Sequence, residues 1–126
     1  MSTPSPGDKR STVAINAQID VMGTHLPERQ QTLRRMRLPV GQRVFYIREP
    51  NNAFDTNAVK VMTHAPKFLG LFGSGFAFLG YVPKEMAVRM AHRMDRGVQF
   101  DGAIERVWYA DYQPDVEIKV RVKQLP

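Results

Sequence analysis

The chain has 126 residues, 43% of them hydrophobic, which is enough to bury one core of ordinary domain size. Its 18 basic and 12 acidic side chains give a net charge of +6, and it contains no cysteine. The lack of cysteine excludes disulfides, thiol nucleophiles and cysteine zinc sites, and no apolar run reaches the ~20 residues of a membrane-spanning helix. A basic domain attracts polyanions, nucleic acid first among them. We expect a cytoplasmic, nucleoid-associated protein in a prokaryote, or a nuclear protein in a eukaryote.

The first eleven residues differ in composition from the rest of the chain. They are rich in Ser, Thr, Pro and Gly and have no apolar segment that could serve as a signal peptide. Because such residues bury little surface, residues 1–11 are predicted to be a disordered tail. Residues 12–126 are predicted to form a single domain.

Alternation of apolar and polar residues predicts most of the secondary structure. In residues 13–21 the odd positions are apolar and most even positions are polar, which is the pattern of a half-buried strand. The sixth predicted strand, residues 116–122, alternates valine or isoleucine with charged residues. The complete set of predicted strands is 13–21, 43–48, 58–62, 78–82, a fifth that begins at 98–104, and 116–122.

One helix is predicted between Pro83, which suits a first turn, and Gly97, which suits a C-terminal stop. Met86, Met90 and Met94 lie on one face of this helix and are expected to join the core. Residues 26–38 are rich in Arg and Gln and form either a short helix or a long basic loop.

The order of these elements indicates the fold class. The strands mostly follow one another without the crossover helices that parallel pairs require. A short antiparallel sheet removes its exposed edges by closing into a barrel. The sequence therefore predicts a mainly β domain, a small six-stranded antiparallel OB-like barrel with one or two helices. Barrels of this type commonly bind single-stranded nucleic acid.

Two segments resemble a known family. Residues 38–61 contain Arg-Glu-Pro-Asn-Asn-Ala-Phe-Asp-Thr-Asn-Ala, and residues 79–85 read Leu-Gly-Tyr-Val-Pro-Lys-Glu. With a shorter match at residues 21–26, these segments resemble the HIRAN domain family. The resemblance implies a modified OB-like barrel that holds the free 3′ end of single-stranded DNA, in proteins where the domain stands alone or is fused to other modules.

The resemblance also implies which residues contact nucleic acid. Phe54 would stack on a base, which contributes about 1–3 kcal/mol per base in single-strand binders. Asp55 would accept a hydrogen bond from a terminal 3′-hydroxyl and repel a 3′-phosphate. Lys84 would neutralise a phosphate. The resemblance places Asn52, Phe54, Asp55, Tyr81 and Lys84 on binding positions; Arg48 is added on charge alone, and His25, which lies in the shorter match at residues 21–26, completes the expected set.

The chain departs from the family pattern at three positions in two segments. Ala53 and Phe54 stand where the family usually has Pro-Tyr, and Leu26 replaces an aromatic residue. A purely structural reading of the same turn also remains open. In that reading Asp55 caps backbone amides, Asn57 holds a bulge and Phe54 plugs one end of the barrel.

We expect a non-catalytic module that needs no cofactor or metal, since His25, His64 and His92 lack metal-ligand spacing. Its expected partners are single-stranded DNA or DNA 3′ ends, with a helicase or nuclease as a protein partner, and no membrane. The role would be targeting in DNA repair or processing.

Two alternative functions come from other segments. The apolar, glycine-rich residues 68–78 could form a loop that binds a protein partner. Asp115, Glu117 and Lys119, with Asp101 upstream, superficially resemble the acidic and lysine residues of metal-dependent nucleases. A cross-strand ion-pair surface explains these charged residues equally well.

Overall fold

The computed structural model describes residues 13–24, 33–34, 36–64, 75–109 and 116–126. The predicted tail, residues 1–11, lies outside this part of the chain. The described elements are β1 (Asn16–Asp20), β2 (Arg43–Arg48), β3 (Val59–His64), β4 (Phe76–Tyr81), α2 (Lys84–Met94), β5 (Phe100–Tyr109) and β6 (Val116–Gln124). The predicted mainly β class, with six strands, is confirmed.

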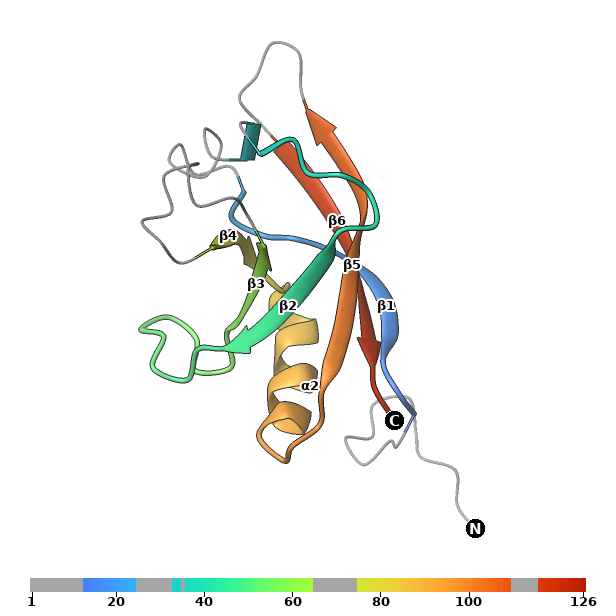
Figure 1. Ribbon diagram of the computed structural model, residues 1–126. Coiled ribbons are helices and arrows are strands. Elements are labelled where there is room, and N and C mark those ends of the chain that lie inside the picture. The colour runs from blue at the N-terminus through green and yellow to red at the C-terminus, as the bar shows by residue number, and fades with distance from the viewer. Residues whose placement is uncertain (1–12, 25–32, 35, 65–74, 110–115) are drawn as a thin grey trace.

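The six strands form one antiparallel sheet in the order β1-β6-β5-β2-β3-β4 (Figure 1). The first and last strands of the chain are neighbours, with Asn16 opposite Lys123. The long strand β5 pairs with β6 and, at Gly102 and Ala103, with β2, so it joins the two halves of the sheet. Register shifts between Ile104 and Arg106 in β5, and at the β3–β4 pairing, allow the sheet to bend.

The two edges of the sheet meet at one point. Met22, just beyond β1, forms an isolated antiparallel bridge with Tyr81 at the end of β4. Gly80 has φ 152°, and a Cβ there would lie 2.2 Å from the Met22 carbonyl oxygen, so only glycine permits this approach. The sheet is therefore curled into a barrel-like shape that, within the described residues, is joined at a single bridge rather than along a continuous ladder.

The core lies inside the curled sheet. In β6 the residues Val116, Ile118, Val120 and Val122 are buried while the charged residues between them face outward, as the alternation predicted. Leu33, from a segment whose residues 33, 34 and 36 are helical, is completely buried as well. Of the basic segment 26–38, residues 26–32 and 35 lie outside the described part of the chain.

Helix α2 begins after Pro83 and ends at Met94, close to its predicted bounds. Met90 is fully buried, and Met86 and Met94 pack against the core, which confirms the methionine stripe as a packing face. The Arg93 guanidinium donates to the Val13 carbonyl oxygen at 2.9 Å and also to the Gln124 side chain, so it ties the helix to the segment before β1 and to the end of β6.

Of the six described strands, only β2 has its predicted bounds; β5 begins at Phe100 rather than 98, β6 extends to Gln124 rather than 122, and the other three differ as follows. β1 begins at Asn16 because Val13 is 71% exposed and takes no part in the sheet. β3 extends to His64 and β4 begins at Phe76, because these two strands pair with each other as far as His64 opposite Phe76. No helix in the described residues is long and apolar enough to cross a membrane.

Candidate nucleic-acid interface

The connection between β2 and β3, residues 49–58, is held by an Asn side chain. Asn52 Oδ1 accepts hydrogen bonds from the backbone amides of Phe54 at 2.9 Å and Asp55 at 3.0 Å. Asn52 Nδ2 donates to Glu49 Oε1 at 2.6 Å. An amide side chain that bonds its own backbone in this way fixes a turn. Asn52 is thus used to shape the loop.

A second turn follows directly. Asp55 Oδ1 accepts a hydrogen bond from the Asn57 amide at 2.9 Å, and the Asp55 carbonyl oxygen accepts one from the Ala58 amide at 3.0 Å. The Glu49 amide donates to the Ala58 carbonyl oxygen at 3.0 Å, which closes the base of the loop. The backbone-capping role that the structural reading gave to Asp55 is therefore present.

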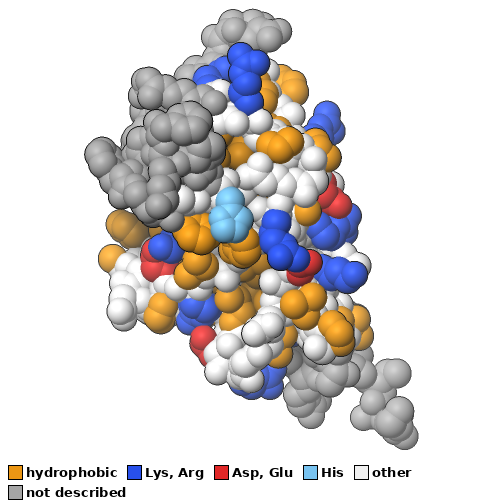
Figure 2. Space-filling model, viewed as in Figure 1, with side chains coloured by type: hydrophobic (Ala, Val, Ile, Leu, Met, Phe, Trp, Pro, Cys, Tyr) orange, Lys and Arg blue, Asp and Glu red, His pale blue; other side chains and the backbone are white. Residues whose placement is uncertain are grey.

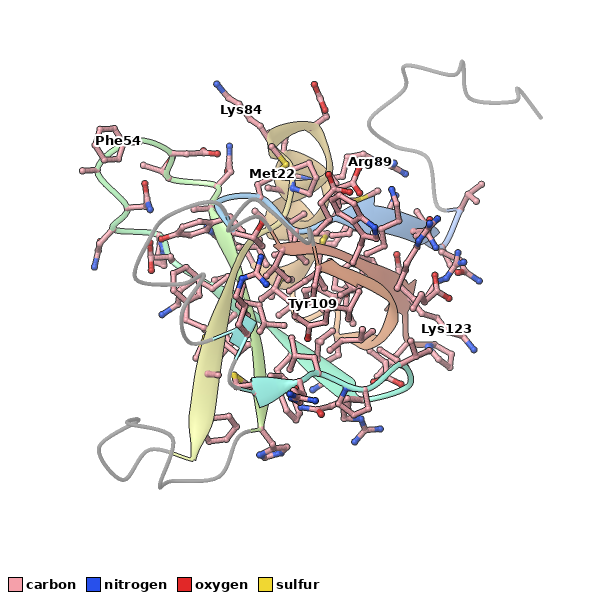
Figure 3. All side chains as sticks on the ribbon, turned by 90° about the horizontal axis from the view of Figure 1, so that it is seen from above. Met22, Phe54, Lys84, Arg89, Tyr109 and Lys123 are labelled. Atoms are coloured by element: carbon pink, nitrogen blue, oxygen red, sulfur yellow. The ribbon has the colours of Figure 1, made fainter. Side chains whose placement is uncertain are left out.

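Phe54 sits at the tip of this braced loop with its side chain in solvent. It is 98% exposed, the highest fraction among the large hydrophobic residues described. Figure 3 shows its ring projecting away from the body of the molecule, on the same side as the Lys84 side chain. The alternative in which Phe54 plugs one end of the barrel is wrong.

Tyr81 and Glu49 connect the loop to the end of β4. The Tyr81 hydroxyl donates to Glu49 Oε1 at 2.8 Å, and Lys60 Nζ lies 3.6 Å from Glu49 Oε2. Hydrogen bonds from Asn52 and Tyr81, together with the nearby Lys60 charge, hold the pKa of Glu49 below its ordinary value. Glu49 therefore stays ionised and serves as an acceptor at the base of the loop.

Arg48 is engaged within the protein. Its guanidinium makes two bonds to the Asp95 carboxylate, at 3.0 and 3.2 Å, and its Nη1 donates to the carbonyl oxygens of Thr56 and Ala58 at 3.0 and 3.1 Å. Its side chain is only 16% exposed. The hydrogen bond from Arg48 lowers the pKa of Asp95. Arg48 thus links the far end of α2 to the loop, an arrangement that suits positioning better than direct phosphate contact.

Two of the expected contact residues remain, Lys84 and His25. Lys84 is exposed at the first residue of α2, where it can reach solvent anions. His25 lies outside the described residues, as do Arg29 and Arg35 of the basic segment. The structure therefore brings Asn52, Phe54, Asp55 and Tyr81 together around one loop, with Arg48 behind it.

The residues that suggested a nuclease are arranged as a charged sheet surface. Lys119 Nζ is paired with Asp20 Oδ1 across β6 and β1 at 2.6 Å, and Glu117 is exposed opposite Trp108. Asp115 lies outside the described residues. In the described ranges no group of three or more acidic or histidine side chains is placed to hold a metal ion.

Glu49 was not assigned a role by sequence reasoning, although it stands inside the Arg-Glu-Pro segment. A signal was present: Glu49 is three residues before Asn52, and the two are separated by a proline turn that brings such side chains together. The partner across the sheet, Tyr81, could not be paired with it from sequence, because 32 residues separate the two.

The architecture defines a class: a small, curled, antiparallel β domain of OB-like type with one helix and a braced loop at its surface. The profile of the HIRAN domain family matches residues 16–123, nearly the whole described fold. The chain belongs to the HIRAN domain family.

Two solved structures are similar in fold. The HIRAN domain of human HLTF superposes with a TM-score of 0.56 at 20% sequence identity, covering 86% of this chain and 74% of that one. A protein from Lactobacillus plantarum superposes with a TM-score of 0.60 at 24% identity, covering 90% of this chain and 96% of that one. A comparison with curated protein sequences found no significant match.

Proposed function

We propose that this HIRAN domain binds single-stranded DNA, and that the loop between β2 and β3 holds the 3′ end of the strand. The observation that carries the proposal is the 98% exposure of Phe54 on a loop whose shape is held by four hydrogen bonds, three accepted by the Asn52 and Asp55 side chains and one donated by Asn52. A preformed loop binds a ligand without the entropy cost of ordering it first. An exposed ring on such a loop is a platform for a base.

Asp55 supports the choice of the 3′ end. Its Oδ1 already accepts one bond from the Asn57 amide. A carboxylate has capacity for several further bonds, so the same group can accept a bond from a 3′-hydroxyl. A 3′-phosphate would bring a second negative charge to this position and would be repelled.

The positive charges favour a nucleic-acid strand over a neutral ligand. Lys84 is exposed on the side to which Phe54 points, and the whole chain carries a net charge of +6. Attraction of a strand by such charges weakens with salt, because each phosphate contact releases counterions.

The domain would act as a targeting module. It would place a helicase or nuclease partner at an exposed DNA end during repair or processing, and it would itself catalyse no reaction. The alternative of a protein-binding loop at residues 68–78 falls largely outside the described residues, since only 75–78 of that range are described.

The experiment is fluorescence anisotropy with 5′-labelled single strands that end in a 3′-hydroxyl or a 3′-phosphate. We expect tighter binding of the hydroxyl form, and a loss of about tenfold in affinity in Phe54→Ala, which corresponds to about 1.4 kcal/mol of stacking. Asp55→Asn should reduce the preference for the hydroxyl end.

Trp108→Ala is the matched control, since Trp108 is another exposed aromatic residue, 49% exposed, on β5. It should bind as the unaltered protein does. Equal affinity for both ends would contradict the end recognition. No binding at low salt would contradict the function as a whole.

A further inference from the structure

Three aromatic rings from three adjacent strands touch on the outer face of the sheet. The rings of Phe45 in β2 and His64 in β3 lie 4.9 Å apart, edge to face. His64 and Phe76 in β4 lie 4.8 Å apart with an interplanar angle of 31°. Phe76 is 41% exposed and His64 is exposed. The cluster therefore presents ring surface to solvent at the end of β3 that is distant from the Phe54 loop.

A second pair of rings lies between this cluster and the loop. Phe78 in β4 contacts Tyr81 edge to face at 5.1 Å, and the Tyr81 hydroxyl is bonded to Glu49 in the loop. Lys60 Nζ lies 6.0 Å from the centre of the Phe78 ring. Rings thus follow β3 and β4 from the loop to the cluster, over the roughly 13 Å that the four steps from Lys60 to His64 span.

The charged side chains on these three strands favour an anionic partner. Strands β2, β3 and β4 contain no Asp or Glu at any position, while Arg43 and Lys60 are on them. The nearest carboxylates belong to other segments: Asp101 of β5 lies 3.4 Å from Arg43, and Glu49 of the loop lies 3.6 Å from Lys60. Arg43 keeps 65% of its side chain exposed. Figure 2 shows hydrophobic side chains gathered around a histidine on this side of the molecule.

We propose that the outer face of β2, β3 and β4 is a second contact surface for single-stranded nucleic acid, which continues the strand held by the loop. This inference rests on the proposed function and adds to it a path for the next bases. Rings interleaved with cations, on strands that carry no carboxylate of their own, match the chemistry of a nucleic-acid strand whose bases stack and whose backbone is anionic. Bases beyond the end would stack at Tyr81 and Phe78 and then at the His64–Phe76 cluster.

The test compares strands of two lengths. A strand of about 3 nucleotides fits the loop alone, whereas one of about 10 nucleotides also reaches the sheet face, within the range of single-strand site sizes. The unaltered protein should bind the longer strand more tightly. Phe76→Ala and His64→Ala should each weaken binding of the longer strand by about tenfold and leave the shorter strand unaffected. Trp108→Ala is the control for an exposed aromatic residue elsewhere.

The outcomes separate the two proposals. If both lengths bind equally, and Phe54→Ala weakens both while Phe76→Ala weakens neither, the sheet face is not a contact surface and the loop function stands. If the longer strand binds and only the Phe76 and His64 variants weaken it, the sheet face is supported and the loop function fails. If Phe76→Ala changes self-association in sedimentation without changing DNA affinity, the face docks protein and the inference is overturned. A thermal melt of each variant shows that it is folded.

Discussion

Met22 and Tyr81 exchange two backbone hydrogen bonds, of 2.8 and 2.9 Å, where the two edges of the sheet meet. The same Tyr81 donates its hydroxyl to Glu49 at the base of the Phe54 loop. One residue therefore joins the sheet edges with its backbone and the candidate binding loop with its side chain. Disturbing the junction should affect both the stability of the fold and the shape of the loop.

Gly80→Ala tests the junction. Its Cβ would meet the Met22 carbonyl oxygen at 2.2 Å, in a backbone conformation that alanine rarely adopts. We expect a loss of at least about 1–3 kcal/mol in the free energy of unfolding. The measurement is urea denaturation followed by the fluorescence of Trp108, the single tryptophan of the chain.

Gly97→Ala is the control for Gly80→Ala. Gly97 also has a positive φ, 93°, but a Cβ there meets no heavy atom within 4 Å. It should lose only the part of the stability that arises from backbone strain. Equal losses in the two variants would show that the contact with Met22 has no energetic weight.

Arg48 could act by positioning the loop or by contacting phosphate, and two variants distinguish these roles. In the positioning role, Arg48→Gln and Asp95→Asn both weaken DNA binding, because each removes the bidentate pair between α2 and the loop. In the phosphate role, Asp95→Asn would free the Arg48 charge and leave binding equal or tighter. We expect weaker binding in both variants, measured by anisotropy at fixed salt.

Glu49 should make the protein sensitive to acid. Its pKa in the folded state lies below the ordinary value near 4.5, so the folded protein binds the proton less readily than the unfolded chain. The stability it contributes is complete above the ordinary pKa and is lost as the pH falls through the lowered value. Glu49→Gln should therefore show a smaller loss of stability between neutral pH and pH values below the ordinary pKa. Urea denaturation across this range measures the difference, and an unchanged pH profile would contradict the assignment.

Tyr46 should make the stability of the fold sensitive to alkaline pH. Its buried hydroxyl donates to the Arg121 carbonyl oxygen at 2.6 Å, and burial, aided by Asp101 and Glu105, raises the pKa of Tyr46. The stability it contributes is complete below the ordinary pKa of a tyrosine and falls as the pH rises above it. Tyr46→Phe should cost about 0.5–1.5 kcal/mol at neutral pH and lessen the alkaline decline. Denaturation at neutral and alkaline pH tests both effects.

Lys84 should contribute to binding through charge alone. Lys84→Gln is expected to weaken DNA binding and to reduce the slope of affinity against salt by about 0.7 for the one phosphate contact removed. Lys123→Gln is the matched control, an exposed lysine on β6 that Figure 3 shows well away from Phe54. A similar change of slope in both variants would indicate non-specific attraction.

The strands could be predicted where local pattern decides the structure. β2 was predicted with its observed bounds, and β6 by the strict alternation from Val116 to Val122. β1 was predicted too long because Val13 fits the alternation although its side chain is exposed and lies outside the sheet. The bridge between Met22 and Tyr81 depends on how the whole sheet curls, which no local pattern encodes.

The candidate site was predictable in place but not in the roles of its residues. The Asn-Asn-x-Phe-Asp segment could be expected to form an Asx-type turn, and it does. Arg48 was predicted from its charge as a phosphate contact, but its partner Asp95 lies 47 residues away and could not be foreseen. The ring cluster of Phe45, His64 and Phe76 was missed because His64 and Phe76 lay outside the predicted strands.

The pairing of β1 with β6 also has a consequence for how the domain can be built into larger polypeptides. Asn16 and Lys123 face each other as neighbouring partners, so a host chain could enter and leave the domain at adjacent points, only about 5 Å apart. Such a unit can be inserted into a surface turn of another protein while the two host residues that flank it stay close together. For the same reason it can be circularly permuted. The Phe54 loop, at the opposite end of β2 from Arg43, need not take part in either connection.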